Sequence, residues 1–267
     1  TTDVDLNFVN DLATGYSCSE DGLTWTFTIR DDVKFTDGEP LTAEDVAFTI
    51  NGINANEAAQ ADLSMIDEAV AIDPTTVELH LNKPYNAMLY TLAVVGIVPK
   101  HAYDAATYGS NPIGSGRYML EQWDRGQQVI LKANPDYYGE APLMDRLIVL
   151  FMEESASLAA AQSGTVDVAY TAATLVDSAD PSGYSVLNCA SVDSRGISLP
   201  SVEAGSPVVV DGDMAFMAGN PVTADTALRR AINMGVNREA MIDNVLNGYG
   251  TVAYSVSDGM PWYNPAM

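Results

Sequence analysis

The first hundred residues alternate apolar and polar positions in a way that predicts β-strands. Apolar side chains occupy every second position from Leu23 to Ile29 and again through residues 76–81. A period of two, rich in β-branched and aromatic residues, is typical of a half-buried strand. A further short strand is predicted at 33–35, just before the turn signal Asp37–Gly38. This part of the chain is therefore expected to contain hairpins.

A helical pattern separates those strands. Thr42 can cap a helix, and Glu44 and Asp45 fall in its first turn, where the helix dipole favours acidic side chains. Apolar residues then recur at helical spacing and form the expected buried stripe, namely Val46, Ala47, Ile50 and Ile53. Residues 1–110 are therefore expected to form a small α+β unit.

A turn-rich segment, Asn111–Gly116, marks the first predicted boundary. Beyond it the pattern predicts a short Ala-rich helix at 155–162, with Gly164 as its cap in the left-handed region. A strand is predicted at 166–170. Strand, capped helix and strand in succession are typical of a parallel βαβ arrangement. Three earlier strands are also expected, at residues 118–123, 128–132 and 146–151.

The last third of the chain predicts less regular structure and then two helices. Residues 172–220 are rich in small and polar residues, with a strand expected at 196–199 and a hairpin at 208–214. Asp211–Gly212 would form the hairpin tip. Helical spacing resumes after Pro221, and the second helix is expected to be capped by Asn237 and followed by Gly248.

Composition excludes several kinds of partner. The 267 residues carry 12 Lys and Arg against 36 Asp and Glu, a formal net charge of −24. A chain this acidic repels phosphate backbones and anionic lipid surfaces, so neither nucleic acid nor such a membrane surface is an expected partner. The longest mostly apolar stretch, residues 88–98, is too short to span a bilayer. The opening ten residues lack the features of a secretory signal, as a mature chain also would.

Candidate catalytic chemistry is sparse. The only histidines are His80, expected to face solvent, and His101, and the sequence contains no GxSxG, HExxH or phosphate-loop motif. Gly114–Gly116 does not continue into a dinucleotide-binding helix. The acid pairs Asp31–Asp32 and Glu153–Glu154 leave a carboxylate-based hydrolase open as an alternative, although a solvated acidic surface is the favoured interpretation. No catalytic residue, metal site or cofactor is predicted.

Two cysteines are too few for a disulfide framework. Cys18 and Cys189 would pair only if they lie close together, and free buried thiols are the favoured interpretation. The absence of a CxxC motif argues against thiol redox chemistry and against a Cys-rich zinc site.

Residues 22–30 (GLTWTFTIR) followed by 33–46 (VKFTDGEPLTAEDV) closely resemble the signature of the peptide/nickel substrate-binding proteins, family 5, of ABC transporters. Further segments resemble the motifs of that family in the same order. They are Asn111–Tyr118 (NPIGSGRY), Asn134–Tyr138 (NPDYY), Gln162–Asp167 (QSGTVD), and Leu228–Ile232 (LRRAI) followed by Asn237–Glu239 (NRE). Arg117, Tyr138 and Asn237 depart from the family, which usually has proline, tryptophan and aspartate there.

The resemblance implies an α/β fold of the type II periplasmic-binding-protein class, with two lobes hinged around a cleft. Residues 1–110 would be the extra α+β subdomain of lobe I, 111–220 its α/β sheet subdomain, and 221–267 the beginning of lobe II. Because family members are much longer, the chain looks truncated.

Most signature residues have a predicted structural role. Gly22, Gly38 and Gly116 suit turns that need a positive φ or a close backbone approach. Trp25 and Phe27 are expected to pack in the core of the small subdomain. Asp167 is expected to hold the end of a strand near the hinge, with a ligand contact as the alternative.

By position in the resemblance, ligand contacts are predicted in two places. One is the loop containing Tyr85 and Asn86 together with Val95 and Gly96, and the other is Tyr170–Thr171. A tyrosine offers an apolar face and a hydroxyl, which suits a peptide. Packing of the tyrosines at the subdomain seam is the equal alternative.

The function that the resemblance implies is solute capture without chemistry. The chain would belong to the extracytoplasmic binding component of an ABC importer, in the periplasm or lipid-anchored at the outer face of the cell membrane. It would act as a monomer that delivers a peptide-like ligand or nickel chelate to a membrane permease. A hydrolase, or a peptide sensor or chaperone on the same scaffold, are the alternatives.

Overall fold

The computed structural model describes residues 1–3, 7–55, 61–179, 184–188, 193–210, 213–255 and 258. The chain divides into two compact units, Thr1–Phe151 and Met152–Met267, and each is described here by itself. In the described part, no helix combines the length and hydropathy that crossing a membrane requires.

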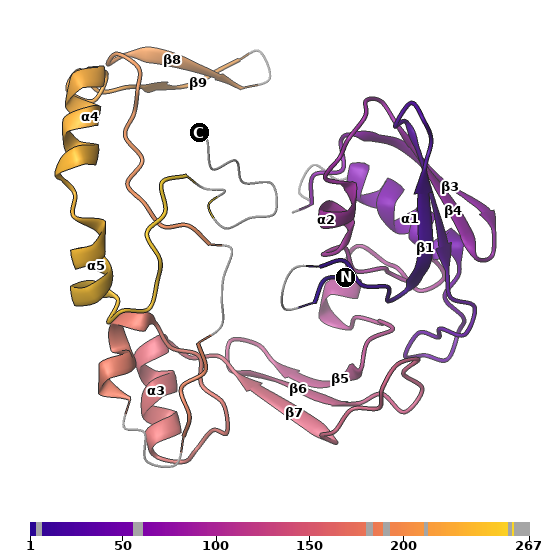
Figure 1. The fold of residues 1–267 in the computed structure, drawn as a ribbon. Coiled ribbons are helices and arrows are strands. Elements are labelled where there is room, and N and C mark those ends of the chain that lie inside the picture. The colour runs from indigo at the N-terminus through magenta and orange to yellow at the C-terminus, as the bar shows by residue number, and fades with distance from the viewer. Residues whose placement is uncertain are drawn as a thin grey trace. The chain divides into compact units, whose positions relative to one another are not determined.

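The first unit begins with a four-stranded antiparallel sheet and one long helix (Figure 1). The spatial order is β1-β2-β4-β3. Two hydrogen bonds of Asn51 tie helix α1 to β3 of this sheet. The side-chain NH₂ of Asn51 donates to the Ala69 carbonyl, and its side-chain oxygen accepts the Ala69 N–H, at 2.9 Å each. The elements are β1 (Ala13–Cys18), β2 (Thr24–Ile29), α1 (Ala43–Asn54), β3 (Ile66–Asp73) and β4 (Thr76–Leu81).

The alternation predicted for the residues of β2 and β4 is confirmed. In β4, Val77, Leu79 and Leu81 are buried while the intervening side chains are partly exposed. Phe27 is buried and Trp25 packs against the same core. From α1 the residues Val46, Ala47 and Ile50 enter the core, and Ile53 packs against it partly buried. Burial of such apolar faces is the main stabilising contribution in this unit.

Residues 33–35 are not the predicted strand. Val33 and Phe35 are almost completely buried and Lys34 between them is exposed, so the alternation is present, but the segment forms no ladder with another strand. Lys34 makes an isolated bridge to Pro40, and the Gly38 N–H donates to the Phe35 carbonyl at 2.9 Å. Gly38 has φ of +96°, which only glycine adopts readily. The backbone hydrogen bonds of this segment are therefore made within a local loop and not with a neighbouring strand.

A second sheet completes the first unit. It is antiparallel in the order β5-β6-β7, formed by β5 (Tyr118–Asp124), β6 (Gln128–Ala133) and β7 (Arg146–Leu150). A short helix, α2 (Met88–Leu92), and a 3₁₀ turn, η1 (Tyr108–Ser110), lie between the two sheets in sequence. The three predicted strands are confirmed, and the change of sheet falls around the predicted turn at residues 111–116.

The second unit consists of short elements. They are α3 (Glu154–Gln162), η2 (Ala173–Ser178), β8 (Ser206–Val210), β9 (Asp213–Ala218), α4 (Thr226–Gly235) and α5 (Arg238–Val245). The predicted hairpin is confirmed by the antiparallel pairing of β8 with β9, and its tip at 211–212 lies outside the described residues. Asn237 caps α5 as predicted, accepting the Ala240 N–H at 3.0 Å.

Two predicted strands of the second unit are wrong. Residues 166–170 and 196–199 have no strand pairing, and the expected parallel βαβ arrangement is absent from the described part of the chain. Gly164, with φ of +72°, ends α3 as expected, but the chain then leaves Val168 86% exposed. An isolated β-branched run does not form a strand without a partner for its backbone groups.

The core is concentrated in the first unit. Among the described residues of the second unit, only the side chain of Ala161 is buried, at 7% exposure. Cys18, predicted to be buried, is an exposed free thiol at the end of the outer strand β1, and Cys189 lies outside the described residues. The predicted divisions at residues 110 and 220 into subdomains and lobes remain predictions.

Candidate ligand-binding site

Four of the predicted ligand contacts flank helix α2. Tyr85 and Asn86 precede the helix, and Val95 and Gly96 follow it. Met88 anchors the helix, because its side chain is completely buried in the core. The four predicted contacts therefore lie on either side of one short helix of the first unit.

The side chains around α2 differ in what they offer a ligand. Tyr85 packs against the core, and its hydroxyl lies 3.3 Å from the Thr91 hydroxyl. Asn86 and Gly96 are exposed, and a Cβ placed on Gly96 would have no atom within 4 Å. Val95 is half-buried, with its N–H bonded to the Leu92 carbonyl at 3.1 Å. The surface beside α2 is thus open and carries an amide and a hydroxyl pair.

The other two predicted contacts lie in the second unit. Tyr170 is 76% exposed in an irregular segment between α3 and η2. The neighbouring Thr171 hydroxyl is buried and has no hydrogen-bond partner in the described structure. Tyr170 and Thr171 belong to the second unit, and the group around α2 belongs to the first.

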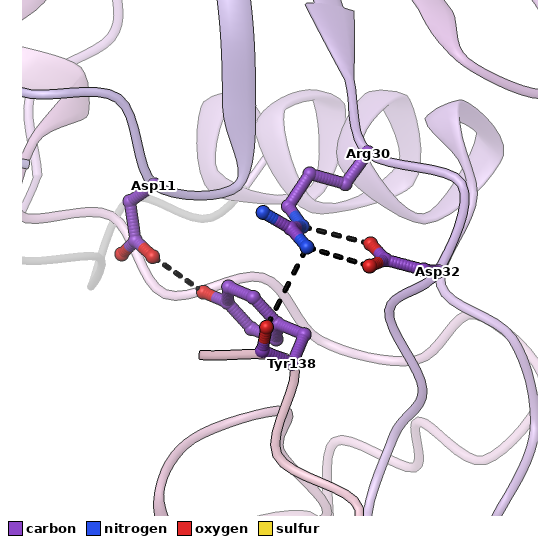
Figure 2. Close-up of polar contacts among 4 residues, drawn as sticks. All are labelled: Asp11, Arg30, Asp32 and Tyr138. Carbon is purple, nitrogen blue, oxygen red and sulfur yellow. Dashed lines mark hydrogen bonds and ion pairs between the residues drawn. The ribbon is translucent and has the colours of Figure 1, made fainter. Parts of the chain in front are cut away.

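A polar cluster that the sequence did not predict joins three segments of the first unit (Figure 2). The Tyr138 hydroxyl donates to Asp11 at 2.7 Å. Arg30 lies over the Tyr138 ring at 5.2 Å and donates through Nε to Asp32 at 2.7 Å. The same guanidinium reaches the Tyr138 carbonyl at 3.5 Å. The chain before β1, the end of β2 and the loop after β6 therefore meet at one point.

A second contact of this kind ties two of the motif segments together. Asn134 is 3% exposed, and its side-chain NH₂ donates to the Gly116 carbonyl at 2.9 Å. Its backbone N–H donates to the Arg117 carbonyl at 2.8 Å, and its side-chain oxygen accepts the Asp136 N–H at 3.1 Å. Buried polar groups of this kind are normally fully paired. Gly116 has no positive φ and is not closely approached, so the conformational role predicted for it is wrong.

The third contact is made by the turn after Phe35. Thr36 donates its N–H to the Gly114 carbonyl at 2.7 Å. His101 Nε2 lies 2.8 Å from the Asp37 carboxylate, and its ring meets Phe35 edge-on. We call these three contact groups together the motif junction. Segments predicted separately from the family motifs thus contact one another, and the only signal for it in the sequence was the motifs themselves.

The electrostatics of the motif junction follow from these contacts. Burial, reinforced by Asp11, raises the pKa of Tyr138, so the phenol stays protonated and donates. The hydrogen bond from Arg30 lowers the pKa of Asp32. The hydrogen bond with Asp37 raises the pKa of His101. Burial alone would raise the pKa of Asp37, but its hydrogen bonds with His101 and the Glu39 N–H outweigh that effect and lower it.

The ionisable side chains of the described residues include no carboxyl whose pKa is clearly raised and no cluster that could hold a metal ion. The carboxyl groups whose pKa values shift, such as Asp32, Asp37 and Asp124, all shift downward, whereas a general acid needs a raised pKa. The alternative acid pair Asp31–Asp32 is exposed, and Asp32 is taken up by Arg30. Among the described residues, no three His, Cys, Asp or Glu side chains cluster in a way that could hold a metal ion.

Comparison with known proteins gives one consistent result. The family model of the bacterial extracellular solute-binding proteins, family 5 (Middle), matches residues 7–267. A Brucella ovis protein assigned as an ABC transporter peptide-binding protein is 34% identical, covering 91% of this chain and 45% of its own length. The chain spans about half the length of the curated relatives it matches.

Solved structures agree with the family model. NikZ from Campylobacter jejuni, in complex with Ni(L-His), has a TM-score of 0.77 and 25% identity, covering all of this chain and 52% of NikZ. The oligopeptide-binding protein AppA from Bacillus subtilis, in complex with a nonapeptide, has a TM-score of 0.67 and 26% identity, covering 95% of this chain and 50% of AppA. The predicted α/β fold of the periplasmic-binding-protein class is thereby confirmed. The chain belongs to the bacterial extracellular solute-binding proteins of family 5.

Proposed function

We propose that this chain is part of the extracytoplasmic solute-binding component of an ABC importer and that it takes a peptide-like ligand or a nickel chelate. The observation that carries the proposal is the family match across residues 7–267. Relatives of the same family bind either class of ligand, as NikZ with Ni(L-His) and AppA with a nonapeptide illustrate. The component would deliver its ligand to a membrane permease as a monomer, in the periplasm or held at the membrane by a lipid anchor.

The proposed mechanism is capture between two lobes. A ligand that contacts both lobes only when they close shifts the population toward the closed state by its differential affinity. On this chain the contacts would come from Tyr85, Asn86, Val95 and Gly96 around α2, and from Tyr170 and Thr171. The open surface beside Gly96 and the exposed ring of Tyr170 support this assignment, since both leave room for a ligand.

Thermal unfolding of the full-length protein tests the proposal. A dipeptide, a nonapeptide and Ni(L-His) would each be added at increasing concentration, and at least one is expected to raise the melting temperature. A ligand present at a hundred times its Kd stabilises the folded state by about 2.7 kcal/mol. The added peptides should be recovered uncleaved. Absence of any shift, or release of peptide fragments, would contradict a binding function.

Substitutions then test the contact residues. Asn86→Ala and Tyr170→Phe are expected to weaken the ligand-induced shift, because each removes a hydrogen-bonding group from the proposed site. Tyr16→Phe is the matched control, since Tyr16 is also an exposed tyrosine but lies on the outer strand β1. An equal loss of the shift in all three variants would argue against these contacts.

A further inference from the structure

Helix α1 borders a hollow in the first unit whose lining does not include the predicted ligand contacts. Its volume is about 490 Å³, within the range of small-molecule sites in proteins. One face of α1 forms most of the wall, because residues 44, 48 and 52 stand at every fourth position of the helix. Besides Glu44 and Lys100, the hollow is lined by Ala47, Phe48, Asn51, Gly52 and Ala71.

The wall of the hollow is mainly apolar. Ala47 is buried, Phe48 and Ala71 are partly buried, and a Cβ placed on Gly52 would meet no atom within 4 Å. The side-chain amide of Asn51 is already engaged, since it bonds the backbone of Ala69 through both its nitrogen and its oxygen. An occupant of this wall therefore needs an apolar group.

Two opposite charges also line the hollow. Lys100 Nζ lies 2.9 Å from the Glu44 carboxylate, and the two side chains are 54% and 66% exposed. An ion pair this exposed contributes little to stability, so its partners can separate at low cost. The hollow thus presents one anion and one cation beside an apolar wall.

The backbone of Lys100 is held in place by α1. Its N–H donates to the carboxylate of Asp45, a buried residue, at 2.9 Å. Two residues earlier, the Val98 N–H donates to the Thr49 hydroxyl at 3.0 Å. The long side chain of Lys100 can therefore move aside for a ligand while its backbone stays close to Glu44. A preformed site of this kind lowers the ordering cost of binding.

We propose that the hollow binds a free α-amino acid with an apolar side chain, such as leucine. The ammonium group would pair with Glu44 and the carboxylate with Lys100, so that two ion pairs replace one. The side chain would lie against Phe48 and leave water. A ligand with a single charge would leave Glu44 or Lys100 without a partner. This inference does not rest on the proposed function, because it concerns other residues.

A ligand-observed NMR titration of the full-length protein tests the proposal. Leucine is expected to bind with a Kd of about 1 mM. It should bind at least about tenfold more tightly than isoamylamine or isocaproate, because each of these keeps the apolar group of leucine but only one of its charges. Equal binding of the three compounds, or no binding of leucine at about 10 mM, would overturn the proposal.

Substitutions locate the bound leucine. Glu44→Gln and Lys100→Met are each expected to raise its Kd about tenfold. Gly52→Leu should abolish binding, because the new side chain would fill the hollow. Glu121→Gln is the matched control, since Glu121 forms another exposed ion pair, with Arg146, outside the hollow. Lys100→Met decides the result should Gly52→Leu fail to fold, and an unchanged Kd in that variant would overturn the proposal.

The same titration separates the hollow from the ligand contacts of the proposed function. Loss of leucine binding in Asn86→Ala or Tyr170→Phe, with no effect of Glu44→Gln, would place leucine at those contacts and overturn the proposal. A peptide or Ni(L-His) that raises the melting temperature should still do so in Lys100→Met. The two sites can therefore fail independently.

Discussion

The hydroxyl of Tyr138 donates a hydrogen bond to the carboxylate of Asp11 at 2.7 Å across 127 residues of sequence. The bond ties the chain before the first sheet to the loop of the second, and the ring packs against the core of the first. Because the motif NPDYY has tyrosine where the family usually has tryptophan, this contact uses a hydroxyl that tryptophan lacks.

Removing that hydroxyl should destabilise the first unit. Tyr138→Phe is expected to lower the free energy of unfolding by about 1–2 kcal/mol, because Asp11 loses a charge-assisted hydrogen bond while the ring packing is kept. Urea unfolding measures the change. Asp11→Asn provides the other arm of a double-mutant cycle, and a cycle with no coupling energy would show that the contact contributes nothing.

Removing the buried side-chain amide of Asn134 should lower the free energy of unfolding more than removing the Tyr138 hydroxyl does. Asn134→Ala is expected to cost about 2–3 kcal/mol, since it leaves the Gly116 carbonyl and the Asp136 N–H without their partners. Urea unfolding again gives the value. Asn82→Ala is the comparison, because Asn82 also bonds a carbonyl, that of Ser64, but is exposed. A loss at Asn134 no larger than that at Asn82 would contradict the proposed linking role.

The contact between His101 and Asp37 should make stability depend on pH. The folded-state pKa of His101 is raised, so its contribution is complete below the unfolded value of about 6.5 and is lost as pH rises through the folded value. The folded-state pKa of Asp37 is lowered, so its contribution is present above about pH 4 and is lost as pH falls through the folded value. The contact is therefore expected to contribute most between about pH 4 and 6.5.

Unfolding free energies measured from pH 4 to 9 check this dependence. His101→Gln should remove the fall above pH 6.5 that the imidazole causes, while the rest of the profile stays. The difference is expected to be small, because both side chains are partly exposed to solvent. A profile identical to that of the unsubstituted chain would show that the ion pair does not form in solution.

Helix α1 contains a glycine whose replacement should stabilise the protein. Gly52 lies near the C-terminal end of the helix, and a Cβ there would meet no atom within 4 Å. Gly52→Ala is expected to add about 0.5–1 kcal/mol, because alanine loses less backbone entropy in a helix. Gly38→Ala should do the opposite, since φ at Gly38 is +96°. Thermal unfolding of both variants checks the two signs, and two shifts in the same direction would contradict the argument.

The sequence by itself determined the elements whose pattern is local. Period-two alternation predicted β2 and β4 and which of their side chains are buried, and helical spacing after Thr42 predicted α1. The helix cap at Asn237 could also be predicted from the sequence, because the capping side chain and the N–H that it accepts are only three residues apart. The motifs also indicated the family, which the comparisons confirm.

Only the tertiary structure decided the features that depend on distant partners. It placed β4 between β2 and β3, made β5-β6-β7 antiparallel, and left residues 166–170 without a strand. A strand exists only when another chain segment pairs with its backbone groups, and no local pattern specifies that segment. For the same reason, the sequence alone predicts neither the contact between Asp11 and Tyr138 nor the exposure of Val149.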